Sequence, residues 1–376
     1  MSLGEVTWDK EPHTEAKHDI FRRYLAAWFP IMAKYVEKLG GTRLVYIDGF
    51  AASGAYSKGE PGSPVIALEA LLQHKLWASK LARLKYTFLF IEIDPARVKH
   101  LEGLLASKQI PPNISHRVVQ GEFESVLTQL IDSLQGAGKA LAPALVFIDP
   151  FGPTGFPMSL LQRILRYRAS ELLITLNLRD LNRWYVPVLD RHGQVDALYG
   201  AQDWRQCLSV SDPEEKERCL RRIYIQQLQV GGGRYIKDFR MVNKHNQTSY
   251  YLVYATHDRK GLAVMKEAMW HVDTSGAFEY SDVTNPNQPF LFGKEFDETH
   301  SQDYATELHM QYGGKEVNYE SLKKATDEHD HYLRRHLTQA LALLVDTRRA
   351  DASSPRVGKG WPSETIFRFS PFRPSP

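Results

Sequence analysis

Apolar runs alternate with segments of helical periodicity over the first two thirds of the chain. The runs read RLVYIDGF, YTFLFIEID, ISHRVVQGEF, APALVFIDPFG and ELLITLNLRD. Between the first two, residues 63–73 have helical spacing and begin with Ser63 and Pro64, a helix-start pair. Strands with little polar alternation, separated by helices, are typical of a parallel sheet covered on both faces. The pattern therefore predicts an α/β fold.

Further elements precede and follow this alternation. Residues 13–41 place apolar side chains at helical spacing and end at two glycines, which predicts a long amphipathic helix. Residues 234–244 and 248–258 are extended runs joined by the sequence HNQ. We expect these runs to form an antiparallel hairpin that closes the sheet, followed by a helix over residues 260–273.

A second domain is predicted after residue 285. Residues 281–300 break all periodicity with proline, asparagine and glycine, so we divide the chain into domains 1–285 and 286–376. The tail then reads as helices over 301–312, 318–329 and 332–350 and a short strand over 364–370. That order of elements predicts a small winged helix-turn-helix domain.

The composition, 376 residues with 43% hydrophobic and 24% charged, is that of an ordinary globular protein. No apolar run reaches the roughly 18 residues that a membrane-spanning helix needs. The N-terminal sequence also lacks the apolar core of a signal peptide, so we expect a cytoplasmic protein with no membrane segment. The net charge of +3 permits a nucleic-acid partner without requiring one.

The two cysteines of the chain, Cys207 and Cys219, are too few for a disulfide framework or a cysteine zinc site. Their spacing matches no paired motif, and we expect buried, reduced thiols. The sequence HDH at residues 329–331 is explained by a polar helix junction, so no metal site is assigned.

Polar residues stand where the predicted strands end. Ligands of parallel sheets bind outside the carboxyl ends of the strands. The residues expected at this edge are Asp48, Glu92, Glu122, Asp149 and Asn177. A single acid at a strand end is usually a helix cap, but acids at successive strand ends favour a ligand site.

The turn DGFAASG, residues 48–54, leaves room for a ligand close to the backbone. It does not fit a phosphate-binding loop, because Ala55 and Tyr56 stand where Lys and Ser or Thr are needed. It also lacks the middle glycine of a dinucleotide fingerprint. The remaining interpretation is the cofactor loop of a class I methyltransferase, which binds S-adenosylmethionine. The loop residues assigned to the cofactor are Asp48, Gly49, Phe50, Ala51, Ser53 and Gly54.

Two further acids extend the predicted cofactor site. Glu92 ends the second strand, where a carboxylate can accept both ribose hydroxyls. Asp94 precedes a proline and is interpreted as a helix cap. Glu122 follows Gly121 at the end of the third strand and would accept the adenine amino group, with Phe123 beside the ring.

The sequence IDPFG, residues 148–152, resembles the (D/N/S)-P-P-(Y/F) motif that follows the fourth strand in amino methyltransferases. Asp149 and the Pro150 carbonyl would accept hydrogen bonds from an exocyclic amine, and Phe151 or Phe156 would stack on a planar base. Positioning and desolvation then suffice for catalysis, without a strong base. The second proline is missing, and a strand-ending turn is the alternative.

Larger blocks of the chain resemble the three-Cys-motif partner family, TcmP, of bacterial methyltransferase-like proteins. The blocks read KHDIFRRYLAAWFPIM, VYIDGFAASGAY, GSPVIALEAL, FIEID, VFIDPFG and YYLVYATHDRKGLAVMKEAMW, with the C-terminal winged-helix segment. The resemblance implies a Rossmann-like class I methyltransferase domain with a C-terminal winged helix-turn-helix. It also implies a separate partner that bears three cysteines and is similar to radical-SAM proteins.

Within these blocks the resemblance implies that Lys17 and Tyr24 close over the cofactor. One position departs from the pattern, because amino methyltransferases commonly have glycine where this chain has Ala52. An added methyl group there would crowd the cofactor or require a shifted turn.

Arginines suited to phosphate contacts occur in both predicted domains. Arg179 and Arg183 follow the fifth strand and would lie at the rim of the site. Arg334 and Arg335 belong to the candidate recognition helix of the tail. The charge beside this helix is mixed in sign, so a protein-docking role for the tail is the alternative.

Three hypotheses follow from these patterns. The first is an S-adenosylmethionine-dependent methyltransferase that acts on an exocyclic base amine of DNA or RNA. The second keeps this activity and changes the substrate to a protein or a small molecule. The third is a cofactor-sensing, non-catalytic module that regulates nucleic acid or its three-cysteine partner.

Overall fold

The computed structural model describes residues 6–282, 293–358 and 360–372. The described residues form two compact units: one extends to Gly261 and resumes at Glu279, and the other holds Leu262–Phe278 and the chain that follows residue 284. The predicted domain boundary between residues 285 and 286 lies outside the described residues. None of the described helices is long and apolar enough to cross a membrane.

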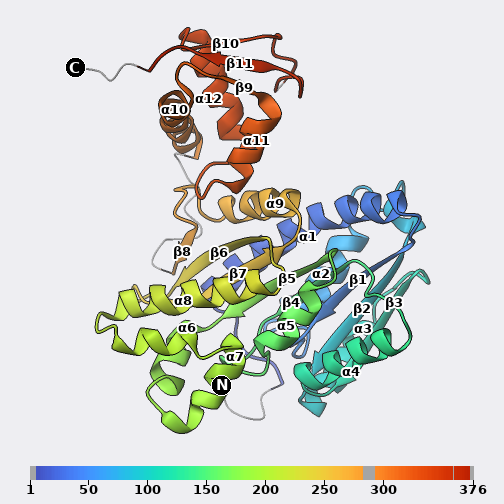
Figure 1. Cartoon of the computed structure of the whole chain (residues 1–376). Helices are drawn as coiled ribbons and strands as arrows, with labels where there is room; N and C mark the ends of the chain where they lie inside the picture. The colour runs from blue at the N-terminus through green and yellow to red at the C-terminus, as the bar shows by residue number, and fades with distance from the viewer. Residues whose placement is uncertain (1–5, 283–292, 359, 373–376) are drawn as a thin grey trace. The chain divides into compact units, whose positions relative to one another are not determined.

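An eight-stranded sheet in the order β3-β2-β1-β4-β5-β7-β6-β8 forms the centre of the first unit (Figure 1). The strands are β1 (Arg43–Asp48), β2 (Lys85–Glu92), β3 (Ile114–Gln120), β4 (Ala144–Ile148), β5 (Ser170–Leu176), β6 (Tyr235–Val242), β7 (Thr248–Thr256) and β8 (Glu279–Ser281). Strands β1 to β5 are parallel, and β7 is antiparallel to both β5 and β6. The predicted α/β fold and its antiparallel closing hairpin are therefore confirmed.

Helices cover both faces of this sheet. They are α1 (Pro12–Lys38), α2 (Ser63–Leu72), α3 (Pro95–Ala106), α4 (Phe123–Gly136), α5 (Met158–Leu165), α6 (Leu178–Asp180), α7 (His192–Tyr199) and α8 (Pro213–Val230). The next helix, α9 (Arg259–Trp270), belongs for most of its length to the second unit. On one face, α4, α5 and α8 pack on the apolar side chains of the sheet in one buried cluster (Figure 1). On the other face, α1 packs through Phe21, whose ring stacks on Phe147 of β4 at 4.7 Å.

The strand order reverses between β1 and β4. The chain passes from β1 to β2 and β3 on one side and then returns to β4 on the other side of β1. Such a reversal leaves a crevice at the carboxyl ends of the two central strands. Because Asp48 pairs with Phe147, the turn after β1 and the turn after β4 begin side by side.

The second unit contains a small antiparallel sheet, β10-β11-β9, and its helices. Its elements after residue 292 are α10 (Gly293–Tyr312), β9 (Glu316–Asn318), α11 (Tyr319–Glu328), α12 (Arg334–Asp346), β10 (Ala350–Ala352) and β11 (Ile366–Phe369). The sequence predicted these helices and β11, but it missed β9 and β10 and started the first helix at residue 301, whereas α10 begins at Gly293. The predicted helix over 332–350 is too long, because α12 ends at Asp346 and β10 pairs with β11 from Ala350 onward.

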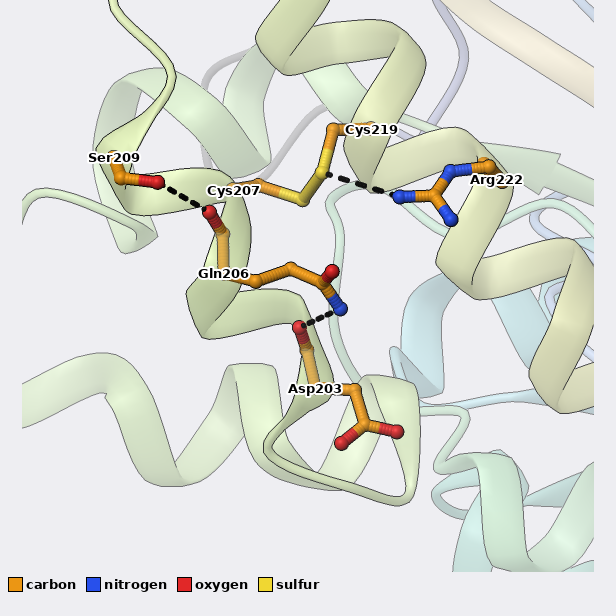
Figure 2. The surroundings of a disulfide bond; sticks show 6 residues. All are labelled: Asp203, Gln206, Cys207, Ser209, Cys219 and Arg222. Atoms are coloured by element: carbon orange, nitrogen blue, oxygen red, sulfur yellow. Dashed lines mark hydrogen bonds between the residues drawn. A yellow bond between two sulfur atoms is a disulfide. The ribbon is translucent and has the colours of Figure 1, made fainter.

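The prediction of reduced thiols is wrong. Cys207 and Cys219 form a disulfide with their Cα atoms 5.8 Å apart (Figure 2). Cys207 lies in the 3-10 turn Asp203–Ser209, and Asp212 caps the start of α8, so the chain reverses between the two cysteines. The prediction failed because cysteine count and spacing do not reveal this reversal, which brings together two residues 12 positions apart in the sequence.

Candidate active site

A pocket of about 650 Å³ opens at the carboxyl ends of β1, β4 and β5 in the first unit. Its wall includes the turn after β1, the turn after β4, the N-terminal part of α1 and Tyr250 of β7. Of the predicted site residues, the lining contains Lys17, Phe50, Ala51, Gly54, Asp149, Pro150 and Phe151. The two turns that the sequence singled out therefore meet at one cavity.

Close packing behind the turn after β1 explains two of its glycines. A Cβ atom at Gly49 would lie 2.5 Å from the Phe123 ring, and Phe123 itself is buried. Gly54 has φ +78°, a left-handed conformation that favours glycine. The turn is thus fixed between the sheet and the helices that follow it.

Ala52 also adopts a left-handed backbone conformation, with φ +52°. Side chains in this region cost about 1–2 kcal/mol relative to the right-handed region. Ala52 is also one of the residues that line the pocket. The alanine at the position of the pattern's glycine is therefore held in a strained backbone conformation.

The two acids that end β1 and β2 form hydrogen bonds within the protein. Asp48 is fully buried and accepts hydrogen bonds from the Tyr46 hydroxyl at 3.2 Å and the Phe50 amide at 3.3 Å. Burial raises the pKa of Asp48 to about 7. The Glu92 carboxylate is 3% exposed and accepts from the amides of Ala52 at 2.8 Å and Asp94 at 2.9 Å. Neither acid lines the pocket.

The remaining predicted cofactor residues lie behind the cavity or away from it. The Ser53 side chain is buried and donates to the Ala55 carbonyl at 2.9 Å. β3 ends at Gln120, and the exposed Glu122 directly precedes α4. Gly49, Ser53, Gly121, Glu122 and Phe123 are not among the residues that line the pocket. Asp94 caps α3 through the amides of Ala96 and Arg97, as predicted.

The turn after β4 faces the cavity directly. Lys17 of α1 donates from its ammonium group to Asp149 Oδ2 at 2.5 Å. Lys17 is 6% exposed and lies over the Tyr250 ring at 5.3 Å, so the ion pair is largely removed from water. Among the described residues the Asp149 carboxylate has no other hydrogen-bond partner, and its second oxygen is available to a ligand.

An exposed aromatic group lies beside this ion pair. The Phe151 ring is 54% exposed and meets the Trp8 ring edge to face at 5.1 Å. The Arg97 guanidinium lies 5.0 Å from the Trp8 centroid and 5.2 Å from that of Phe151. Trp8 and Arg97 were not among the predicted site residues. Neither residue carries a spacing signal, because their meeting depends on how the N-terminal segment returns to α3.

Two residues of α1 differ in their relation to the pocket. His18 lines it, donates to or accepts from the Tyr56 hydroxyl at 3.4 Å, and has its pKa lowered by burial and by Lys17. Tyr24 lies in the core, where its hydroxyl is 2.6 Å from Glu171 and 2.5 Å from the Tyr254 hydroxyl. Tyr24 therefore stabilises the sheet and does not reach the pocket.

The four arginines that were predicted to contact nucleic acid lie in different environments. Arg179 lines a neighbouring pocket, and the Arg183 guanidinium lies over the Trp184 ring at 4.6 Å. In the second unit, Arg334 forms two hydrogen bonds of 2.6 Å with the Asp327 carboxylate. Arg335 is 3.4 Å from Glu267 and lies over Trp270. Both arginines of α12 are thus engaged within their own unit.

A comparison with protein-family models finds no match, and a comparison with curated proteins finds none either. Among solved structures, the chain is similar to Trm1 from Pyrococcus horikoshii, which was solved with S-adenosyl-L-methionine. The two chains are 13% identical with a TM-score of 0.36, and the match covers 72% of this chain and 61% of Trm1. It is also similar to an O-methyltransferase from Bacillus cereus, solved with SAH, at 12% identity and a TM-score of 0.30, over 66% and 92% of the two chains. Both likenesses are weak, and the function below rests on this chain's own residues.

Proposed function

We propose that the chain is an S-adenosylmethionine-dependent methyltransferase that acts on an exocyclic base amine of DNA or RNA. The observation that carries the proposal is the meeting of two turns at one pocket. The glycine-bearing turn after β1 and the Asp149–Gly152 turn after β4 line the same cavity at the carboxyl edge of a parallel sheet.

The pocket fits such a cofactor in size and chemistry. Its volume of about 650 Å³ lies within the range of small-molecule sites. The small residues Ala51, Ala52 and Gly54 line the cavity, which suits a ligand that approaches the turn closely. Glu92 does not line this cavity, so its proposed part is to hold the cofactor turn through the Ala52 amide rather than to accept the ribose hydroxyls directly.

Asp149 and Pro150 would orient the acceptor nitrogen. Lys17 holds Asp149 Oδ2, which leaves Oδ1 and the Pro150 carbonyl to accept from the two N–H groups of an amine. These hydrogen bonds direct the nitrogen lone pair into the pocket. S-adenosylmethionine, when bound, supplies the methyl group. Asp149 is then placed to take the proton that the methylated nitrogen loses.

The aromatic edge of the pocket suits a planar acceptor. Phe151 and Trp8 offer aromatic rings, and the flat guanidinium of Arg97 lies against both of them. Bases bind to such groups by stacking, with a contribution of about 1–3 kcal/mol for each base. A nucleobase amine is therefore preferred to an aliphatic amine as the acceptor.

The second unit and the partner belong to the same proposal. We infer that α10, β9, α11, α12, β10 and β11 form a winged helix-turn-helix that contacts nucleic acid or protein. The predicted phosphate contacts of Arg334 and Arg335 would require these side chains to leave Asp327 and Glu267. A three-Cys-motif, radical-SAM-like partner is proposed from the sequence resemblance.

One observation favours a second candidate function. Ala52 lines the pocket in a strained conformation, and a methyl group in place of the pattern's glycine hydrogen would weaken cofactor binding. A chain of this kind would serve as a cofactor-sensing regulator rather than an enzyme. The two candidates differ in whether methyl transfer occurs at all.

Methyl transfer to short DNA and RNA oligonucleotides from radiolabelled S-adenosylmethionine tests the proposal. Asp149→Ala should lower turnover by about 10²–10³-fold, the usual cost of removing a group that positions or stabilises the reacting centre. Asp149→Asn is the matched control, because the amide keeps an oxygen that accepts a hydrogen bond from the amine, as in the asparagine form of the motif. If the two variants lose activity equally, or if wild type transfers no methyl group, the proposed role of Asp149 is wrong.

A further inference from the structure

A second pocket of about 560 Å³ adjoins the candidate active site within the first unit. The two pockets share part of their lining, namely Glu11, His13, Asn177, Asp180 and Tyr250. They are therefore neighbouring hollows with a common wall. A ligand larger than the cofactor and one base can extend from the first hollow into the second.

Unpaired basic groups distinguish the second pocket from the first. Arg179 of α6 lines it, and so do Lys244 and His245 from the turn between β6 and β7. Among the described residues neither Arg179 nor Lys244 has an acidic partner. Lys17, in the wall of the first pocket, is by contrast already paired with Asp149.

The acids of the second pocket are each held by a neighbour. Asp180 accepts from the Asn177 amide at 2.8 Å. His13 lies between the other two, with Nδ1 at 3.0 Å from Asp282 and Nε2 at 2.9 Å from Glu11. These contacts engage the carboxylate oxygens without removing their negative charge, and the guanidinium and the ammonium are the lining groups that can contact an anion.

We propose that this second pocket binds a phosphodiester group of the nucleic-acid strand whose target base enters the candidate active site. The proposal rests on the proposed function and names the polymer contact of that same site. Arg179 and Lys244 provide the charge, and Asn243 and Ser249 provide neutral donors at the same wall. These are the side chains that proteins use for phosphate oxygens.

The shared wall also explains how one nucleotide would use both pockets. Enzymes that modify a base take it out of the stack, which separates the base from the path of the backbone. The base would stack near Phe151, and its phosphate would lie beyond Asn177 and Tyr250, beside Lys244. Arg334 and Arg335 are paired with acids in the second unit, so the strand contact is assigned to the first unit.

Fluorescence anisotropy of the full chain with labelled single-stranded DNA and RNA 12-mers tests this assignment. The double variant Arg179→Gln/Lys244→Gln should bind at least tenfold more weakly. The slope of log affinity against log salt should fall by about one, because the two side chains contact one phosphate and each neutralised phosphate adds about one. The control Arg117→Gln/Lys139→Gln removes the same charge from exposed residues that line neither pocket. It should keep wild-type affinity and slope.

Equal losses in both double variants, or an unchanged salt slope in Arg179→Gln/Lys244→Gln, would overturn the proposal. The proposal would also be overturned if neither 12-mer binds at low salt, or if a nucleoside monophosphate binds as tightly as the strand. Calorimetry with S-adenosylmethionine separates this result from the proposed function, because the Arg179→Gln/Lys244→Gln variant should keep cofactor affinity. If the chain transfers methyl groups but the Arg179→Gln/Lys244→Gln variant keeps wild-type strand affinity and salt slope, only the phosphodiester site in the second pocket is refuted.

Discussion

The acids that end β1 and β2 resemble the acid that follows β4 in the sequence, but their surroundings differ in the structure. Asp48 and Glu92 are buried and accept hydrogen bonds from amides of the turn that follows β1. Asp149 lines the pocket and is held by a single ammonium group. The carboxylate of a strand-end acid is therefore either occupied by backbone amides or open to a ligand, depending on which hydrogen-bond donors lie next to it.

The strand register explains part of this difference. Asp48 is the last residue of β1 and is paired with Phe90 of β2 on one side and Phe147 of β4 on the other. Asp149 stands one position beyond Ile148, the last paired residue of β4. The carboxylate of Asp48 is enclosed by the sheet, whereas that of Asp149 projects from its edge.

The largest expected effect concerns Glu92. Glu92→Ala leaves the amides of Ala52 and Asp94 without their acceptor, at about 1–3 kcal/mol each, or about 2–6 kcal/mol of unfolding free energy together. Glu92→Gln keeps one acceptor oxygen and should lose about half as much. Urea denaturation measures both. A Glu92→Ala variant as stable as wild type would show that the carboxylate does not hold the turn.

The next effect concerns the pH dependence of Asp48. Its pKa rises from 3.8 to about 7 on burial, so the folded state keeps a proton that the unfolded state has lost. Stability should therefore fall as the pH rises from about 4 to about 7, by on the order of 4 kcal/mol at most. Asp48→Asn, which cannot ionise, should flatten this dependence. Parallel pH slopes for the two proteins would refute the buried, protonated carboxyl.

Some features of the fold and of the pocket could be predicted from the sequence, and others could not. Apolar runs predicted the parallel sheet, its closing hairpin and the edge where the pocket lies, because these depend on local pattern and on the rule for strand ends. The depth of Asp48, the occupied oxygens of Glu92 and the burial of Phe123 depend on register and packing. No one-dimensional spacing carries that information.

The missed contacts have a similar cause. Trp8 and Arg97 come together from distant parts of the chain, and the disulfide of Cys207 depends on a chain reversal. Counting residue types predicted none of these. The DPFG motif, in contrast, is contiguous, and all four of its residues line the pocket as their sequence position suggested.

A smaller effect concerns Ala52. Ala52→Gly should relieve the left-handed strain, and because glycine costs more entropy on folding the net gain is about 1 kcal/mol or less. It should also tighten cofactor binding by removing a methyl group from the pocket wall. Thermal unfolding and calorimetry measure the two effects. A variant that is less stable than wild type would show that the turn tolerates alanine without strain.

The most direct measurement of the central claim is a calorimetric titration of the full chain with S-adenosylmethionine and S-adenosylhomocysteine. We predict one site with a dissociation constant on the order of micromolar, and tighter binding in Ala52→Gly than in wild type. An absence of binding at millimolar cofactor in both proteins would contradict the assignment of this pocket to S-adenosylmethionine.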